Sequence, residues 1–477
     1  WIDAGEFERA DTLTIETSVV WVIGNDSRYT IVKFDDAAAG PCRALQVLNA
    51  DTVTIRSLRV QNAYRGLLLR FARNCLVYDV QASGNNNGVT LEWGDLGTSR
   101  NTVSNCYFYQ NSWAGLCLSS ADSNTISSCR SEQNGVKGFI LGWWSDSNIV
   151  IGCTSDSNAG DNFHAFSNAK GNTFRGNRST KAGGIGFYIQ DNADSTFLYG
   201  NVNETSTVDG FKVSNSDFCR LEANVSFQDT SSGIAICSDA ETNTVINNTL
   251  LGTASQGIWT DAERNTYDSN AVRSTRGHGI VLSDADYNIL LRNRVEDVDS
   301  YGIYLNSGSE YNTFTDNVSE LNGVHGIWID ASSHNAFTRN LSSANAENGF
   351  HLTGGSNGNS FDADTASRNT GHGVYIGYSD SNYFTACLLE TSGYGASVDR
   401  DGFNIGGGDS NGFFNCVVRG SRSSGFAFYS NADSNIVSGC TIAGNGANGV
   451  WGGTSDRVRF TGNTITGNTQ DGFNLTS

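Results

Sequence analysis

The sequence contains 1 Pro and 0 Met in 477 residues, and only 17% of its residues are charged. The near absence of Pro excludes a collagen-like chain, and no apolar run approaches the length of about 18 residues that a transmembrane helix needs. Aromatic residues make up 11% of the chain, which is more than disordered sequences tolerate. Gly, in contrast, is abundant at 55 residues. A chain rich in turn formers but almost free of Pro is typical of a repeat protein.

Basic residues are also scarce, with 30 Lys and Arg against 49 Asp and Glu and a net charge of −19. This balance disfavours nucleic acid and anionic membranes as partners, and it would repel a polyanionic polysaccharide unless cations intervened. The sequence starts at Trp1, without Met or a signal sequence, which is typical of a processed, exported protein. We therefore expect an extracellular or cell-surface location.

A short motif repeats along the chain: Gly followed by an apolar residue, any residue and a second apolar residue. Its intervals are mostly 22 to 24 residues, stretched to 27 before Gly115 and 29 before Gly402, and Asn162 replaces Gly once. About nine residues after each Gly comes Asn-x-[Ile/Val/Phe]-x-x-[Asn/Cys], as in Asn312–Asn317 and Asn435–Cys440. Self-similarity at such a period indicates a solenoid.

The alternation within the motif predicts strands. In Gly302-Ile303-Tyr304-Leu305, Ile and Leu would point to one face and Tyr304 to the other. Such a segment is too short to be stable alone, but copies stacked about 4.8 Å apart form a parallel sheet with a continuous core. Inward Asn amides can bond to the Asn of the next coil, Gly can supply left-handed corners, and Pro would remove ladder donors.

This pattern, over roughly residues 44–477, resembles the right-handed parallel β-helix repeat of pectate-lyase-like proteins. It is most similar to the Asn-rich NosD-type repeats of archaeal surface proteins. The resemblance implies an all-β, single-domain solenoid of about nineteen coils with internal Asn and Cys ladders. We expect residues 1–43 to form an N-terminal strand segment and an irregular first coil, and residues 44–477 to form the regular β-helix.

The resemblance does not select a function, because this fold carries lyases, epimerases, hydrolases, tailspikes and structural proteins. NosD proteins are associated with copper-site maturation. A chain without Met, and without His residues at ligand spacing, offers copper no obvious site. We expect no required cofactor.

The ladder register also sorts the cysteines and the glycosylation sequons. Six Cys fall at or beside the second ladder position, where buried small residues are favoured over disulfides between coils: Cys106, Cys129, Cys153, Cys387, Cys416 and Cys440. Four sequon Asn lie in the ladder and should point inward: Asn177, Asn224, Asn317 and Asn340. The remaining candidates for glycosylation are Asn25, Asn203, Asn247 and Asn474.

An acidic column lies two residues before the first ladder Asn. Its members are Asp122, Asp146, Asp194, Asp217, Glu241, Glu263, Asp286, Glu310, Asp380, Asp409 and Asp433. Asp favours turns through side-chain bonds to the backbone, and this is one interpretation. The other is a stripe that binds calcium, whose oxygen ligands it would supply, or that faces a basic neighbour.

An aromatic column lies two residues after Gly and should face outward. It contains Tyr188, Trp259, Tyr304, Trp328, His351, Tyr375 and Trp451, four of them on consecutive coils. Three interpretations stay open: stabilisation of the sheet by stacking, contact with a protein partner, and stacking on sugars.

Catalytic candidates are weak. His351 with Glu347, Asp330 and Tyr375 could form an acid–base cluster for sugar chemistry. No Arg or Lys column is visible that would neutralise a polyuronate substrate. The sequence therefore disfavours an enzymatic function. If the protein is an enzyme, we expect a polysaccharide lyase, an epimerase or a glycoside hydrolase.

Both ends of the chain expose apolar residues that could extend the stack, namely Trp1, Ile2, Phe473 and Leu475. Complementary open ends generate filaments when the rotation between copies does not close. The leading hypothesis is therefore a self-associating structural subunit of an extracellular filament, sheath or surface layer. The alternative is a carbohydrate-active β-helix, either an enzyme or a tailspike-like glycan binder.

Overall fold

A computed structural model describes residues 4–9, 11–28, 30–34, 42–93, 97–395 and 400–475. Within these ranges the chain consists of strands and turns and contains no helix. The described residues accordingly offer no helix long and apolar enough to cross a membrane. The chain divides into two compact units, Trp1–Thr244 and Val245–Ser477. The predicted division at residues 43 and 44 stays a prediction, since part of the first segment lies outside the described residues.

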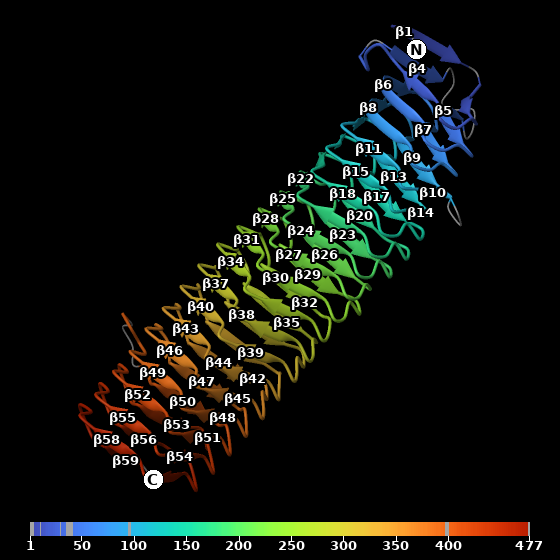
Figure 1. The fold of residues 1–477 in the computed structure, drawn as a ribbon. Coiled ribbons are helices and arrows are strands. Elements are labelled where there is room, and N and C mark those ends of the chain that lie inside the picture. Colours follow the sequence, from blue (N-terminus) through green and yellow to red (C-terminus); the bar gives the residue numbers. More distant parts are fainter. Residues whose placement is uncertain are drawn as a thin grey trace. The chain divides into compact units, whose positions relative to one another are not determined.

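Each coil contributes three short strands that pair in parallel with their equivalents in the next coil (Figure 1). In unit 1, strands β15 (Thr125–Ser127), β16 (Arg130–Glu132) and β17 (Lys137–Gly142) form one coil. They pair in turn with β18 (Ile149–Ile151), β19 (Thr154–Asp156) and β20 (Phe163–Ala165). This arrangement confirms the predicted parallel β-helix.

The third strands of successive coils form what we call the third-strand sheet. In unit 1 it contains β2 (Leu13–Ile15), β5 (Arg43–Leu48), β7 (Arg65–Arg70), β9 (Asn87–Glu92), β13 (Ala114–Ser119), β17, β20, β23 (Phe187–Gln190), β26 (Phe211–Ser214) and β29 (Ile234–Cys237). In unit 2 it contains β32 (Ile258–Thr260), β35 (Ile280–Ser283), β38 (Ile303–Asn306), β41 (Ile327–Asp330), β44 (Phe350–Thr353), β47 (Val374–Gly377), β50 (Phe403–Gly406), β53 (Phe426–Tyr429), β56 (Val450–Gly452) and β59 (Phe473–Leu475).

The first and second strands of the coils form the other face. In unit 1 these are β1 (Gly5–Arg9), β3 (Trp21–Ile23), β4 (Thr30–Phe34), β6 (Thr54–Gln61), β8 (Leu76–Ser83), β11 (Thr102–Ser104), β12 (Tyr107–Tyr109), β15, β16, β18, β19, β21 (Thr173–Arg175), β22 (Arg178–Thr180), β24 (Phe197–Tyr199), β25 (Val202–Glu204), β27 (Arg220–Glu222) and β28 (Val225–Phe227), with β10 (Thr98–Ser99) and β14 (Ala121–Asp122) as a short extra pair. Strand β30 (Thr244–Ile246) contains the division, and unit 2 continues with β31 (Thr249–Leu251), β33 (Thr266–Asp268), β34 (Ala271–Arg273), β36 (Ile289–Leu291), β37 (Arg294–Glu296), β39 (Thr313–Thr315), β40 (Val318–Glu320), β42 (Ala336–Thr338), β43 (Leu341–Ser343), β45 (Ser360–Asp362), β46 (Thr365–Ser367), β48 (Tyr383–Thr385), β49 (Leu388–Glu390), β51 (Gly412–Phe414), β52 (Val417–Arg419), β54 (Ile436–Ser438), β55 (Thr441–Ala443), β57 (Arg459–Thr461) and β58 (Thr464–Thr466).

Inward side chains stack on their equivalents to build the core. In unit 1 the rings of Phe139 and Phe163 lie parallel, with centroids 5.0 Å apart, and Phe187 continues the stack at 4.6 Å. In unit 2 the rings of Phe337 and Phe361 are 4.7 Å apart. Because successive coils repeat the same inward positions, neighbouring rings such as these stack on one another, which adds stacking energy to the burial of apolar area.

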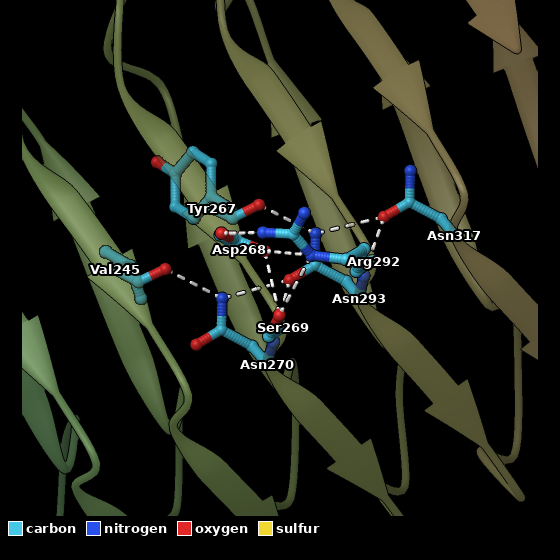
Figure 2. Close-up of polar contacts among 8 residues, drawn as sticks. All are labelled: Val245, Tyr267, Asp268, Ser269, Asn270, Arg292, Asn293 and Asn317. Carbon is cyan, nitrogen blue, oxygen red and sulfur yellow. Dashed lines mark hydrogen bonds and ion pairs between the residues drawn. The ribbon is translucent and has the colours of Figure 1, made fainter.

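The predicted Asn ladders are present (Figure 2). The Asn293 side-chain oxygen accepts hydrogen bonds from the backbone N–H and the amide group of Asn270, at 3.0 and 2.9 Å. The Asn293 amide nitrogen donates in turn to the Tyr267 carbonyl at 2.8 Å and to the Asn317 oxygen at 3.0 Å. The ladder therefore satisfies the buried polar groups at a corner that no strand pairing reaches.

A third ladder was missed from the sequence. The amides of Asn111, Asn134 and Asn158 bond in series after the second strand, with N···O distances of 2.8 to 3.0 Å between their side chains. Its signal is a Ser three residues earlier, as in Ser131 and Asn134, where the Ser hydroxyl accepts from the amide at 2.9 Å.

Asp364 replaces Asn in the second ladder of unit 2. One carboxyl oxygen accepts from the backbone N–H and the amide group of Asn340, at 2.6 and 2.9 Å. The other oxygen has no partner among the described residues, and burial raises the pKa of Asp364 to about 7. The ladder therefore tolerates a carboxyl group there at the cost of a shifted protonation equilibrium.

The repeat Gly residues serve a different purpose from the one predicted. Gly138 does not have a left-handed φ, whereas polar residues such as Ser128 (φ 51°) and Gln133 (φ 53°) occupy left-handed corners. A Cβ on Gly138 would lie 2.0 Å from the Ser155 hydroxyl and 2.5 Å from the Asn162 carbonyl oxygen. The prediction of Gly corners is thus wrong for the motif Gly, and at Gly138 the next coil approaches the backbone too closely for a Cβ atom.

Ten of the eleven cysteines are buried, and Cys42 is half-buried. Cys219 takes the place of a first-ladder Asn, and its N–H donates to the Asn243 side-chain oxygen at 2.7 Å. The prediction of small buried side chains at ladder positions is confirmed for Cys106, Cys129, Cys153, Cys387, Cys416 and Cys440.

Candidate functional site

Unit 1 contains a pocket on the outer surface of its third-strand sheet. The cavity measures about 630 Å³ and is lined by Tyr64, Arg65, Asn86, Asn87, Thr90, Glu92, Trp93, Trp113, Cys117, Ser119, Ser120, Trp143 and Trp144. Strands β7, β9 and β13 supply its floor, since Thr90 and Cys117 alternate with the inward residues of their strands. The four Trp residues adjoin the ends of third strands, where outward side chains can fold over the sheet.

The pocket walls are held by apolar packing. Trp113, Trp143 and Phe166 pack against Cys117 and Ile140. The Trp143 ring meets the Phe166 ring edge to face, with centroids 4.8 Å apart, which fixes the orientation of Trp143. The side chains of Trp93 and Trp144 are more exposed, with exposed fractions of 55% and 62%. The site therefore combines two anchored and two exposed indole rings.

The pocket floor contains polar atoms without partners. Among the described residues, the Asn87 side-chain oxygen, the Thr90 hydroxyl and the Arg65 Nε have no hydrogen bond. Asn87 and Thr90 are only 6% and 2% exposed. Buried polar groups are normally satisfied, so unpaired ones that line a cavity indicate a position for a polar ligand or for water.

A buried carboxylate lies among arginines beside this floor. Arg65 binds Glu92 through two bonds of 2.9 and 2.6 Å, and the Arg70 Nε is 3.9 Å from the same carboxylate. Arg43 lies opposite Arg65 in the strand register. Burial and the positive charges of Arg65 and Arg70 lower the pKa of Arg43, although Glu92 opposes them. Arg43 and Arg65 share one register position on adjacent coils, but Asn87 follows there and Arg70 lies opposite Leu48 and Glu92, so the arginines form a local cluster and not a column.

A second polar cluster lies farther along the same sheet. The Asp161 carboxylate is 3.0 Å from the Lys137 Nζ and 3.2 Å from the His164 Nδ1. Burial would raise the pKa of Asp161, but the hydrogen bond from His164 and the nearby positive charges hold it well below its usual value. His164 stacks on Tyr188 with centroids 4.8 Å apart. This cluster is mostly buried, so it supports the sheet beside the pocket.

The predicted aromatic column faces outward, and all seven of its members are half-buried by their neighbours. In unit 2, Tyr304 and Trp328 stack at 4.7 Å, Trp328 meets His351 at 5.8 Å, and His351 stacks on Tyr375 at 4.8 Å. Four further residues, which precede the repeat position and were not assigned to the column, extend this stack: His278, Tyr301, His325 and His372. The stacking geometry supports the interpretation as sheet stabilisation.

The four weak catalytic candidates do not form an acid–base cluster. The His351 Nδ1 is 2.7 Å from the Asn348 amide nitrogen, and Asp330 accepts a hydrogen bond from the Thr353 hydroxyl at 3.1 Å. Glu347 is exposed on a loop. Of these candidates, only His351 and Tyr375 are in ring contact.

The buried histidines of this stack predict a pH dependence for unit 2. Burial lowers the pKa of His325 to about 4 and that of His351 to about 3, the latter also through neighbouring histidines. The unfolded chain, with a His pKa of about 6.5, binds more protons below that pH. Stability from these residues is therefore complete above pH 6.5 and falls as the pH drops toward 4, by about 3 kcal/mol for each of the two.

Urea unfolding of His351→Phe and wild type between pH 4 and 7 checks this expectation. The stability difference should change with pH in favour of the variant at low pH. His334→Phe, at an exposed position, is the control and should run parallel to wild type. Comparison with wild type removes the contribution of Asp364, whose raised pKa acts in the opposite direction. Parallel curves for His351→Phe would contradict the assignment.

The acidic column forms a ladder of backbone caps. The Asp122 carboxylate accepts from the Asp146 N–H at 2.8 Å, Asp286 from Glu310 at 2.7 Å, and Asp409 from Asp433 at 2.7 Å. These bonds join neighbouring coils, so they differ from the bonding within one turn that was considered from the sequence. Across the described ranges, no group of three or more His, Cys, Asp or Glu could hold a metal ion. Calcium binding by the column stays a prediction.

The remaining sequence candidates divide by exposure. Asn203 is fully buried, and its amide donates to Asp229 at 2.6 Å, so this glycosylation candidate was wrong: its strand turns it into the core. Asn25 and Asn247 are exposed and Asn474 is half-buried, while Asn177, Asn224, Asn317 and Asn340 point inward as predicted.

Of the four residues predicted to extend the stack at the chain ends, Phe473 and Leu475 are 45% and 62% exposed. Trp1 and Ile2 lie outside the described residues.

The described residues do not fit copper. The imidazole rings of His325 and His351 lie face to face, with centroids 4.0 Å apart, so their in-plane lone pairs cannot converge on one ion. The thiols of Cys129 and Cys153 are buried, and burial raises their pKa well above the usual value. They are therefore held in the protonated form, which is a poor metal ligand.

Comparison with known proteins identifies two matching family models. A model described as the right-handed β-helix region matches residues 43–178, 232–389 and 391–477. A model described as periplasmic copper-binding protein (NosD) matches residues 133–257. No curated protein matches the sequence.

Solved structures show similarity of fold. A chain of the Vag8–C1 inhibitor complex aligns with 99% of each chain at 12% identity and a TM-score of 0.49. The catalytic domain of a GH87 α-1,3-glucanase aligns at 12% identity and a TM-score of 0.45, over 63% of this chain and 60% of that one. A periplasmic alginate epimerase aligns at 14% identity and 0.35, over 69% and 78%. The chain spans less than two thirds of the glucanase domain, and likeness at this level does not extend to function.

Proposed function

The chain belongs to the right-handed β-helix family, and we propose that this member binds carbohydrate in the tryptophan pocket of unit 1. The observation that carries the proposal is the pairing of four indole rings with unsatisfied polar atoms at the pocket floor. A sugar ring presents both an apolar face and hydroxyl groups. The first suits the Trp side chains, and the second suits the Asn87 oxygen and the Thr90 hydroxyl.

The size and openness of the pocket agree with this ligand class. A cavity of about 630 Å³ lies within the usual range for ligand sites of about 300–1,000 Å³. Trp93 and Trp144 are more than half exposed, so an extended chain can pass over them. We place such a protein outside the cytoplasm, at the cell surface or in the periplasm, where polysaccharides are met.

The described residues support binding more directly than hydrolysis. Glycosidases use two carboxyl groups about 5 to 9 Å apart, whereas Glu92 is the only acidic residue in the described pocket lining. Glu92 is also engaged by Arg65. No described contact favours the filament-subunit hypothesis, which light scattering of the purified chain would test.

Removing either anchored indole should weaken carbohydrate binding. Trp113→Ala and Trp143→Ala each delete a wall of the pocket, and each should weaken binding by about 10-fold or more, since a buried aromatic contact contributes about 1.5 kcal/mol or more. Affinity electrophoresis against a panel of neutral and acidic polysaccharides, followed by titration of Trp fluorescence, measures the effect.

Trp259→Ala, which removes a half-buried Trp from unit 2, is the matched control and should bind like wild type. If no polysaccharide of the panel binds, or if both pocket variants bind as wild type does, the proposed function is wrong. Release of unsaturated or reducing sugar ends by the wild type would show that the site also catalyses cleavage.

A further inference from the structure

The pocket borders a concentration of positive charge that an otherwise acidic chain does not need for its fold. Arg65 and Arg70 lie 2.6 and 3.9 Å from one carboxylate, Glu92, and Arg43 lies opposite Arg65 on the neighbouring coil, in a protein with a net charge of −19. Three guanidinium groups against one carboxylate leave two unneutralised positive charges among the described residues. Like charges at adjacent strand positions repel one another, so the cluster is costly unless an anion joins it.

The cluster also has hydrogen-bond donors to spare. The Nε atoms of Arg43, Arg65 and Arg70 are buried and donate no hydrogen bond to any described residue. Glu92 occupies the Nη1 and Nη2 of Arg65, which leaves its Nε edge for another acceptor. A guanidinium group has five N–H donors in a planar fork that matches the oxygen spacing of carboxylate and sulfate groups.

The neighbouring rings hold the arginines in place. The Arg70 guanidinium lies over the Phe71 ring at 5.6 Å and over the Trp93 ring at 5.4 Å, and Arg65 lies over Tyr64 at 5.7 Å. Trp93 and Tyr64 both line the pocket. The rings that would contact a saccharide are therefore the rings that position the cationic groups, so one ligand can reach both.

Resting on the proposed function, we infer that the saccharide bound in this pocket is acidic, and that Arg65 and Arg70 recognise its carboxylate or sulfate group. Glu92 acts as a positioning residue, because its two bonds to Arg65 orient the guanidinium group toward the cavity. The unsatisfied Asn87 and Thr90 atoms then contact sugar hydroxyls, while the Trp side chains contact ring faces. A single acidic saccharide would therefore account for the arginines, for the positioning carboxylate of Glu92, for the unsatisfied polar atoms and for the Trp side chains.

Matched ligands test the inference on the full chain. Oligogalacturonides are compared with their methyl esters, and a sulfated galactan oligosaccharide with its desulfated form, by isothermal titration calorimetry at low and high salt. We expect at least one acidic form to bind about 10-fold or more tightly than its neutral partner, as charge-assisted bonds predict. The pair that shows the difference distinguishes carboxylate from sulfate.

Arginine variants locate the recognition. Arg70→Gln should remove the preference for the acidic ligand, while the affinity for the neutral form should not change. Arg70→Lys should retain part of the preference for the acidic ligand. Arg178→Gln, at an exposed Arg on the opposite face of unit 1 that pairs with Glu204, is the control. Circular dichroism confirms that each variant is folded.

The outcomes separate the two proposals. Equal affinity for acidic and neutral forms, still dependent on Trp113, overturns the acidic-ligand inference and leaves carbohydrate binding in place. An acidic preference that Arg70→Gln does not change also overturns it. Failure of every oligosaccharide to bind overturns both.

Discussion

Asn293→Ala should destabilise unit 2 by about 4 kcal/mol. The change removes the acceptor for the Asn270 N–H and amide group, and it removes the donor to the Tyr267 carbonyl and the Asn317 oxygen (Figure 2). Each buried group left without a partner costs about 1–3 kcal/mol. The site is fully buried, and alanine is too small to admit water to all of these groups.

Urea unfolding of Asn293→Ala followed by circular dichroism measures the loss. Asn357→Ala is the matched control, since its side chain also accepts a backbone N–H of the next coil, that of Asp380 at 2.6 Å, but at an exposed site. We expect the control to lose about 1 kcal/mol or less. Asn293→Cys should fall between the two, because Cys387 and Cys416 occupy equivalent ladder positions. Equal losses for Asn293→Ala and Asn357→Ala would show that burial of the ladder is unimportant.

The fold could be predicted from the sequence because its determinants are local and repeated. Asn288 and Asn293 lie five residues apart within one coil, and each meets the same residue type in the next coil. A register read in one coil therefore applies to the others. The third ladder escaped notice because its Asn residues lie in turns of variable composition, marked only by the preceding Ser.

The pocket could not be predicted in the same way, because it depends on departures from the repeat. Glu92, Arg65 and Trp113 belong to three different coils, and no spacing rule links them. One signal was available: the interval of 27 residues before Gly115. The extra residues fall between Glu92 at the end of β9 and Thr98 at the start of β10 in the sequence.

The second large prediction concerns the motif glycines. Their role depends on distances between backbone atoms of neighbouring coils, which cannot be read from the sequence. Gly138→Ala should lower the stability of unit 1 by more than about 4 kcal/mol. The new Cβ would lie 2.0 Å from the Ser155 hydroxyl and 2.5 Å from the Asn162 carbonyl oxygen. The hydroxyl could rotate away, but the carbonyl belongs to the backbone of the next coil. Relief would require the two coils to separate, which would break the parallel pairing of β17 with β20.

Gly176→Ala provides the control in the same unit. Gly176 has a φ of 60°, and nothing lies within 4 Å of a Cβ built on it. Its substitution therefore costs only the left-handed backbone penalty of about 1–2 kcal/mol. Thermal and urea unfolding, with soluble yield as a second readout where Gly138→Ala does not fold, compare the two variants. If Gly176→Ala were as damaging as Gly138→Ala, conformational freedom rather than close approach would explain the motif. A large loss confined to Gly138→Ala would instead establish that the spacing between coils, set at the motif Gly, determines how the third-strand sheet is built.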